Sequence, residues 1–93
     1  MSSMMKIKIL YRKNLKMSPG KLAAQAVHAV LGFVTLNEVV DPVCSVIVLG
    51  VSNKKFDEAR SYLKASCHVV KDAGYTEVEP GTETCLAYLE EDE

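Results

Sequence analysis

Apolar side chains recur along this chain with two spacings, one typical of strands and one typical of helices. An alternating segment near the start and three short apolar runs further on predict four strands. Two longer segments, in which apolar residues recur every three or four positions, predict two helices. We expect strands over residues 5–11, 44–51, 67–71 and 84–89, and helices over residues 18–37 and about 54–66.

The segment 18–37 carries the strongest helix signal in the chain. Ser18 is a good N-cap, and Pro19 suits the first helical position. Apolar residues occupy nearly all sides of this helix, so we expect it to be mostly buried.

One polar seam interrupts the apolar surface of this helix. Lys21, Gln25 and His28 stand at positions i, i+4 and i+7, which share one face. Lys21 lies in the first turn, where the helix dipole disfavours a cation. The unpaired N–H groups at the same end attract an anion. The sequence therefore predicts a small anion site at the start of the helix.

The second strand and the second helix are expected to pack more conventionally. The run at 44–51 is continuously apolar, which predicts a strand covered on both faces. Ser52 or Asn53 can cap the helix that follows. The inner stripe of that helix is expected to consist of Phe56, Ala59, Tyr62 and Leu63.

The order of these elements is β-α-β-α-β-β. Right-handed crossovers should make the first three strands parallel, whereas the last two lack a crossover helix and should be antiparallel if they pair. The expected fold class is α/β, with a four-stranded mixed β-sheet and helices packed on it. We expect the 93 residues to form one domain, 1–93, with an acidic tail at 90–93.

This topology predicts where chemistry takes place. Lys21 follows the carboxyl end of the first strand, and Asp72 follows that of the third. Thr84 begins the fourth strand, which runs back, so it starts at the same rim. Open α/β sheets usually bind ligands at such a rim. We expect the long loop at 73–83, with turn signals at Ala73-Gly74-Tyr75 and Pro80-Gly81, to form a wall of the site.

Composition narrows the function classes. About 48% of residues are hydrophobic and 25% are charged, as in ordinary globular proteins. No apolar run reaches the length of a membrane span, and the first residues lack the apolar region of a signal peptide. We therefore expect a cytoplasmic protein.

Charge is distributed unevenly, although the net charge is −1. Six bases and no acid occur in residues 1–21, and eight acids and no base follow from Asp72 onward. This asymmetry indicates either a polyanionic partner for the basic end or simply a solvated surface with an acidic tail. On charge alone we favour the second interpretation.

The remaining reactive residues predict no separate site. Cys44, Cys67 and Cys85 are widely spaced and lie in apolar runs, which predicts free thiols rather than a metal site. His28 is expected either to be a partly buried histidine bonded to Gln25 or a strand, or to support the site. His68 is expected to be structural.

Two motifs resemble those of the type II peptidyl-tRNA hydrolases. The first consists of Lys16-Met17, the run from Gly20 to Gln25, and His28-Ala29; the second consists of Asp72-Ala73-Gly74 with Thr76, Glu79 to Thr82, Thr84 and Leu86-Ala87. The resemblance covers about residues 5–88 and implies a homodimer that hydrolyses the ester between a peptide and the 3′ ribose of tRNA. It implies no metal and no cofactor.

The resemblance also implies roles for individual residues. The family's functional positions fall on Lys21, Asp72 and Thr84, with Gln25 and His28 as possible supporting residues. Contacts to tRNA are expected mainly at phosphate and sugar groups, which makes binding sensitive to salt. The residues expected to contact tRNA are Lys13, Lys16, Lys54, Lys55 and Tyr75, together with Lys6.

The chain departs from the family pattern in several places. Tyr75 stands where an arginine is usual, and Ser18-Pro19 stands where a Gly-Lys pair is commoner. The segment before Cys44 is short, and the acidic tail is foreign to the family. An alternative function therefore stays open at this point: a non-catalytic module on the same fold that binds tRNA, another RNA or a protein.

Overall fold

The computed structural model describes residues 5–37, 44–72 and 78–90, and its helices and strands follow the predicted order. The strands are β1 (Met5–Arg12), β2 (Cys44–Val51), β3 (Cys67–Lys71) and β4 (Glu83–Glu90). The α-helices are α1 (Pro19–Asn37) and α2 (Asn53–Leu63), and two short 3-10 helices are η1 (Lys13–Leu15) and η2 (Lys64–Ser66). The residues expected to end the first helix, 38–43, and the Ala73-Gly74-Tyr75 turn lie outside the described residues.

The four strands form one mixed sheet in the order β2-β1-β4-β3. β1 pairs in parallel with β2, and β4 pairs antiparallel with both β1 and β3. The first three strands therefore run in one direction and the last two are antiparallel, which confirms the prediction. The position of β4 between β1 and β3 was not predicted, because hydrophobic pattern identifies strands but not their neighbours.

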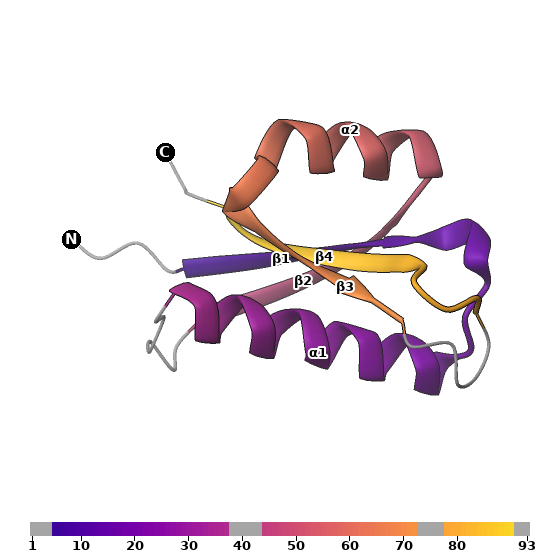
Figure 1. The fold of residues 1–93 in the computed structure, drawn as a ribbon. Helices are drawn as coiled ribbons and strands as arrows, with labels where there is room; N and C mark the ends of the chain where they lie inside the picture. Colours follow the sequence, from indigo (N-terminus) through magenta and orange to yellow (C-terminus); the bar gives the residue numbers. More distant parts are fainter. Residues whose placement is uncertain (1–4, 38–43, 73–77, 91–93) are drawn as a thin grey trace.

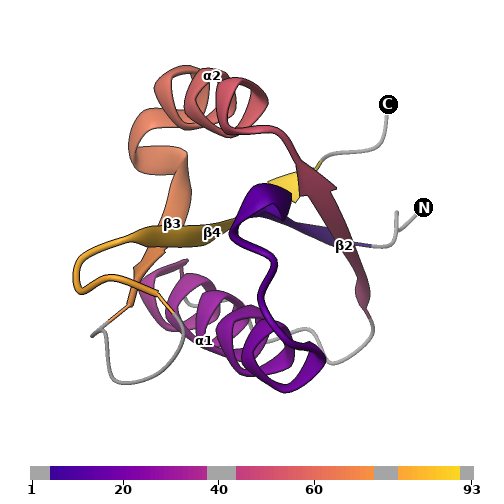
Figure 2. The ribbon, with the colours of Figure 1, turned by 90° about the vertical axis from the view of Figure 1, so that its right-hand side faces the viewer.

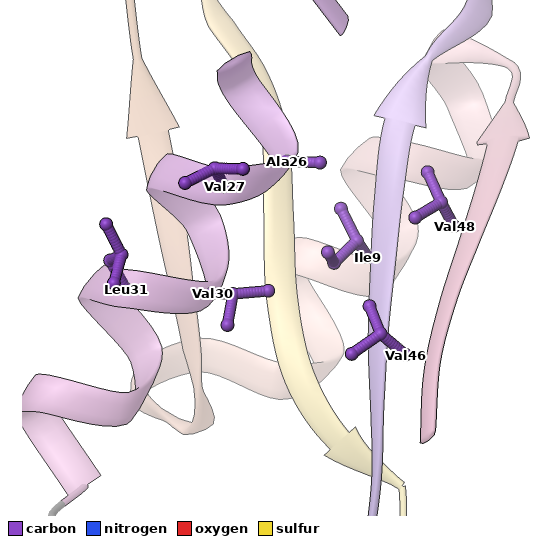
Figure 3. Close-up of a pocket in the computed structure, with 7 residues that line it drawn as sticks. All are labelled: Ile9, Ala26, Val27, Val30, Leu31, Val46 and Val48. Atoms are coloured by element: carbon purple, nitrogen blue, oxygen red, sulfur yellow. The ribbon is translucent and has the colours of Figure 1, made fainter. Parts of the chain in front are cut away.

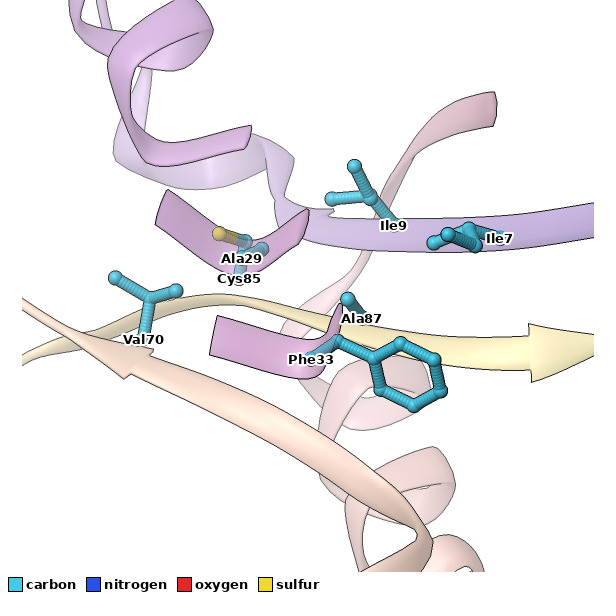
Figure 4. Packing of buried hydrophobic residues seen from close by; sticks show 7 residues of the cluster. All are labelled: Ile7, Ile9, Ala29, Phe33, Val70, Cys85 and Ala87. Carbon is cyan, nitrogen blue, oxygen red and sulfur yellow. The ribbon is translucent and has the colours of Figure 1, made fainter. Parts of the chain in front are cut away.

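The two helices cover opposite faces of the sheet (Figures 1 and 2). Between α1 and the sheet lies the larger core cluster, drawn in Figure 4, which consists of Ile7, Ile9, Ala29, Phe33, Val70, Cys85 and Ala87. Under α2 lies a smaller cluster of Leu10, Phe56 and Leu86. The alternation of side chains along β1 and β4 places neighbouring residues in different clusters.

A β-bulge interrupts this alternation at the start of β4. Val70 pairs with Cys85, but the next residue of β3, Lys71, pairs with Glu83. Thr84 is therefore an extra residue on β4 with no partner opposite it. Such a bulge turns a side chain away from the face that strict alternation would assign to it.

The predicted burial of β2 and of α1 was wrong. β2 is an edge strand and is not covered on both faces, since Val46 and Val48 are 48% and 42% exposed. α1 is only half buried, and Val27 and Leu31 are more than half exposed. The reason is that α1 packs mainly on β4, β3 and β1, so that both the outer side of the helix and β2 are left uncovered.

The second helix also differs from the prediction in detail. Tyr62 is 86% exposed and does not belong to the inner stripe, whereas Phe56 is fully buried. At about 100° per residue, Tyr62 lies about 120° around the helix from Phe56, beyond the apolar face. The α-helix ends at Leu63 rather than Ser66, and η2 completes the connection to β3.

No helix among the described residues combines the length and apolar character that a membrane span requires.

Candidate functional site

The carboxyl ends of the parallel strands meet at one edge of the molecule, at the right of Figure 1. α1 begins at this edge after β1, β3 ends there, and β4 begins there. The structure therefore brings Lys21, Asp72 and Thr84 to one place, although they come from three different elements.

These side chains form one continuous polar network through Gln25. Lys21 Nζ forms an ion pair with Asp72 Oδ1. Gln25 Nε2 donates to the same carboxylate oxygen at 3.4 Å, and Gln25 Oε1 accepts from the Thr84 hydroxyl. The amide of Gln25 thus joins the carboxylate to the hydroxyl, and we refer to Lys21, Asp72, Gln25 and Thr84 as the Lys21–Thr84 network.

The network is buried except at its lysine end. Gln25 and Asp72 are buried, and Thr84 has no exposed surface. The side chain of Lys21 keeps 11% of its surface exposed, against 5% for that of Asp72. Lys21 is therefore the member of the network that is most exposed to solvent, and Thr84 is the most deeply buried.

Local backbone structure explains the position of Lys21. Ser18 Oγ accepts a hydrogen bond from Lys21 N at 3.2 Å, and the first helical hydrogen bond, from Leu22 N to Ser18 O, measures 2.9 Å. Ser18 is thus the predicted N-cap. The helix dipole disfavours a cation in this turn, and the carboxylate of Asp72 offsets that cost.

The backbone of Asp72 is held by the segment that leads into β4. Asp72 N donates to Thr82 O at 2.9 Å, and Gly81 N donates to Asp72 O at 2.7 Å. Gly81 has a φ of 82°, which glycine adopts readily, and it follows Pro80 in the predicted turn. Asp72 and Thr84 are therefore positioned by one short segment.

Gln25 is also held through its own backbone. The Cys85 thiol donates to Gln25 O, with 3.3 Å between sulfur and oxygen. Burial raises the pKa of this thiol from its ordinary value of 9.0 to about 11, so the thiol stays protonated at neutral pH. Cys85 is a free thiol in the core, as predicted, while Cys67 is free and half-buried.

The histidines do not join the network. His28 is exposed, so the expectation of a partly buried histidine was wrong. It lies about 60° around the helix from Gln25, on the side away from buried Ala29. His68 packs against α1, since a Cβ added at Gly32 would lie only 2.1 Å from His68 Nε2.

Exposed lysines surround this edge of the sheet. Lys13 and Lys16 lie between β1 and α1, and Lys54 and Lys55 lie in the first turn of α2, which follows the carboxyl end of β2. Lys6 is near the other end of β1, away from this edge. Tyr75 lies outside the described residues.

Sequence reasoning missed one residue beside the network. Arg12 was counted only among the bases of the first 21 residues, but its side chain is bonded within the fold. Nothing in the local pattern distinguishes it from Lys13, because its partners come from α2 and β4.

Comparison with known proteins identifies the family. A family model described as Peptidyl-tRNA hydrolase PTH2 matches residues 5–91, nearly the whole chain. This chain belongs to the PTH2 family. The match confirms the resemblance that the two motifs indicate.

Archaeal relatives of this PTH2 chain agree in name. The peptidyl-tRNA hydrolase of Methanopyrus kandleri is 40% identical over 90 residues, which cover 84% of this chain and 78% of the relative. That of Methanothermobacter thermautotrophicus is 36% identical over 100 residues, with 96% and 88% covered. That of Haloquadratum walsbyi is 40% identical over 95 residues, with 89% and 83% covered.

Proposed function

We propose that the Lys21–Thr84 network is the site at which this chain hydrolyses the ester bond of peptidyl-tRNA, releasing the peptide and free tRNA. Membership of the PTH2 family favours the hydrolase over a non-catalytic binding module. The observation that carries the assignment of the site is the ion pair between Lys21 and Asp72, linked through Gln25 to Thr84. We expect this reaction in the cytoplasm, where translation supplies the substrate.

In the proposed reaction, Asp72 acts on a water molecule and Lys21 acts on the ester carbonyl. The carboxylate takes a proton as the water oxygen bonds to the carbonyl carbon. The ammonium of Lys21 has three N–H donors, and one faces Asp72, so another can donate to the developing oxyanion. Collapse of this intermediate breaks the bond to the 3′ oxygen of the ribose, and this oxygen takes the proton that Asp72 accepted from the water.

Thr84 and Gln25 are positioning residues in this proposal. The Thr84 hydroxyl has no exposed surface and donates to Gln25, which supports an orienting role rather than attack on the ester. Gln25 in turn donates to the carboxylate, so the hydroxyl fixes the amide and the amide fixes Asp72.

The lysines around the site support binding of the tRNA end. Lys13, Lys16, Lys54 and Lys55 are exposed at the edge where the network opens. A negatively charged backbone laid across this edge would bring its 3′ terminus toward Lys21. Tyr75, which lies outside the described residues, stays a predicted contact.

A second copy of this chain is the proposed partner, through an apolar surface between α1 and β2. It contains a pocket of about 240 Å³, shown in Figure 3, lined by Ile9, Ala26, Val27, Val30, Leu31, Val46 and Val48. Exposed apolar patches of this kind mark interfaces. In a two-fold dimer the same patch meets itself, and this lining, which has no charged residue, brings no like charges together.

Deacylation of an N-acetylated aminoacyl-tRNA by the purified protein tests the function and the site. We expect turnover by the wild type and a loss of at least about 100-fold in kcat for Lys21→Met and for Asp72→Asn. Lys64→Met, which makes the same change of charge as Lys21→Met but at the other edge of the sheet, should retain wild-type kcat. No turnover by the wild type would contradict the function, whereas full activity of the two site variants would contradict only the site.

A further inference from the structure

The side chain of Arg12 is bound by protein acceptors on every nitrogen. Nε donates to Glu83 O at 2.7 Å, Nη1 to Asn53 Oδ1 at 3.0 Å, and Nη2 to Asp57 Oδ1 at 2.8 Å. The guanidinium carbon also lies 4.1 Å from the centre of the Phe56 ring. Only 16% of the side-chain surface is exposed. Arg12 therefore differs from an exposed base that is available to bind a phosphate, because each of its nitrogens already donates within the protein.

The bond to Glu83 O ties Arg12 to the bulge. In the ladder between β1 and β4 the last pair is Tyr11 with Cys85, so Arg12 lies just past the end of regular pairing. The carbonyl that Nε holds belongs to the residue directly before Thr84, the extra residue of β4. A bulge leaves ladder groups without regular partners, and Arg12 supplies a side-chain donor at this point.

The Glu83–Thr84 peptide therefore has different contacts on the two faces of the sheet. On the α2 side, Arg12 fixes the carbonyl of Glu83 against Asn53 and Asp57 of the helix. On the α1 side, the Thr84 hydroxyl reaches Gln25, and the preceding residues 81 and 82 hold the backbone of Asp72. Movement of the Glu83–Thr84 peptide would displace both partners of Gln25.

We propose that Arg12 is a positioning residue for ester hydrolysis, which clamps the β4 bulge so that Thr84 and Asp72 meet Gln25 in the productive arrangement. The inference rests on the proposed role of the Lys21–Thr84 network. It removes Arg12 from the group of bases available to tRNA phosphates and assigns to it an effect on kcat. Arginine suits this task because its planar fork binds several acceptors at once, which lysine does not reproduce.

Arg12→Lys tests the proposal because it keeps the positive charge and removes the fork. We expect kcat for N-acetylated aminoacyl-tRNA to fall about tenfold, with KM and its salt dependence unchanged. In a Thr84→Val background the same substitution should cost less than about twofold, because Arg12 acts through Thr84. Amide hydrogen exchange of the segment around residues 83–86 should accelerate in Arg12→Lys, a readout that needs no catalysis.

Lys8→Met is the matched control, since it removes another link between β1 and β4, the 2.8 Å ion pair of Lys8 with Glu90. It should leave kcat unchanged. If Arg12→Lys does not fold, Asp57→Asn weakens one contact of the clamp and should lower kcat while leaving KM unchanged.

Two results would overturn the proposal. A raised KM with a flatter salt slope at unchanged kcat would make Arg12 a phosphate ligand. A loss that multiplies in full with that of Thr84→Val would mean that Arg12 does not act through the bulge. Inactive wild-type protein with faster exchange in Arg12→Lys would instead contradict the proposed function while supporting the clamp.

Discussion

Gln25 shows how one neutral side chain satisfies two different neighbours. Its N–H group faces the Asp72 carboxylate and its oxygen faces the Thr84 hydroxyl. Glutamate at this position would place a second carboxylate beside Asp72, and methionine would remove the hydrogen bond to each neighbour. The amide is therefore the side chain that fits between an acceptor and a donor in a buried site.

The raised pKa of Cys85 predicts that the free energy of unfolding falls at alkaline pH. Its pKa is about 11 in the folded protein and near 9.0 when the chain unfolds, so between these values the unfolded state loses a proton that the folded state keeps. Stability from this group is complete below pH 9 and falls as the pH rises toward 11, by roughly 2 to 3 kcal/mol. Urea unfolding of the wild type at pH 8 and pH 10.5 should show this loss.

Cys85→Ala is the comparison for this prediction. The variant keeps the weaker alkaline contributions of Lys8 and Cys67, whose pKa values are also raised, by the hydrogen bond to Glu90 and by burial respectively. Its free energy of unfolding should therefore fall less between the two pH values. Equal falls in both proteins would contradict the prediction.

At the scale of elements, the sequence was sufficient for identity and order but not for burial. Periodicity located all four strands and both helices to within about three residues, because each spacing is a local property. Burial of Val46 and of Leu31 depends on which strand lies at the edge, and this is decided by the insertion of β4 between β1 and β3.

The site was predicted only in part, again because some of its contacts depend on how distant strands pair. Lys21, Asp72 and Thr84 follow from strand direction, which the order of elements determines. The contact of Thr84 with Gln25 depends on the bulge, which alternation along β4 does not reveal. Arg12 escaped notice because its partners are at least 41 residues away in the chain.

The two helices offer a matched pair of N-caps for separating stability from activity. Ser18 Oγ accepts from Lys21 N, and Ser52 Oγ accepts from Lys55 N, both at 3.2 Å. Ser18→Ala and Ser52→Ala should each lower the free energy of unfolding by about 1 kcal/mol. Only Ser18→Ala should also lower kcat, by at least about threefold, because it loosens the turn that carries Lys21. Equal kcat values for the two variants would show that the cap does not position the lysine.

At the scale of the whole molecule, opposite edges of the sheet carry lysines with different expected effects. Replacing Lys13 and Lys16 by glutamine should weaken tRNA binding and reduce the slope of log K against log salt by about 1 to 2. Replacing Lys6 and Lys64, which lie toward the other edge, by glutamine makes the same change of net charge. This control should leave the salt slope unchanged. Filter binding across a salt series would contradict the assignment if both double variants lost the same slope.

The apolar surface between α1 and β2 predicts the oligomeric state. Leu31→Glu places a charge in the pocket of this surface and should convert a dimer to a monomer at micromolar concentration in sedimentation experiments. Tyr62→Glu changes an exposed residue on α2, which covers the other face of the sheet, and should leave the mass unchanged. A wild type that sediments as a monomer would contradict the proposed dimer.

The position of β4 in the sheet determines when the domain can fold during synthesis. β4 lies between β1 and β3, yet it is synthesised after both. Its residues Thr84, Cys85, Leu86 and Ala87 have no exposed surface, so the centre of both core clusters is added last. While β4 is still inside the ribosome, β1 and β3 have no contact through the sheet and the site has no hydroxyl. Folding of the described domain must therefore wait for release of β4. The contacts that β4 then makes with β1 span most of the sequence, which favours slow folding.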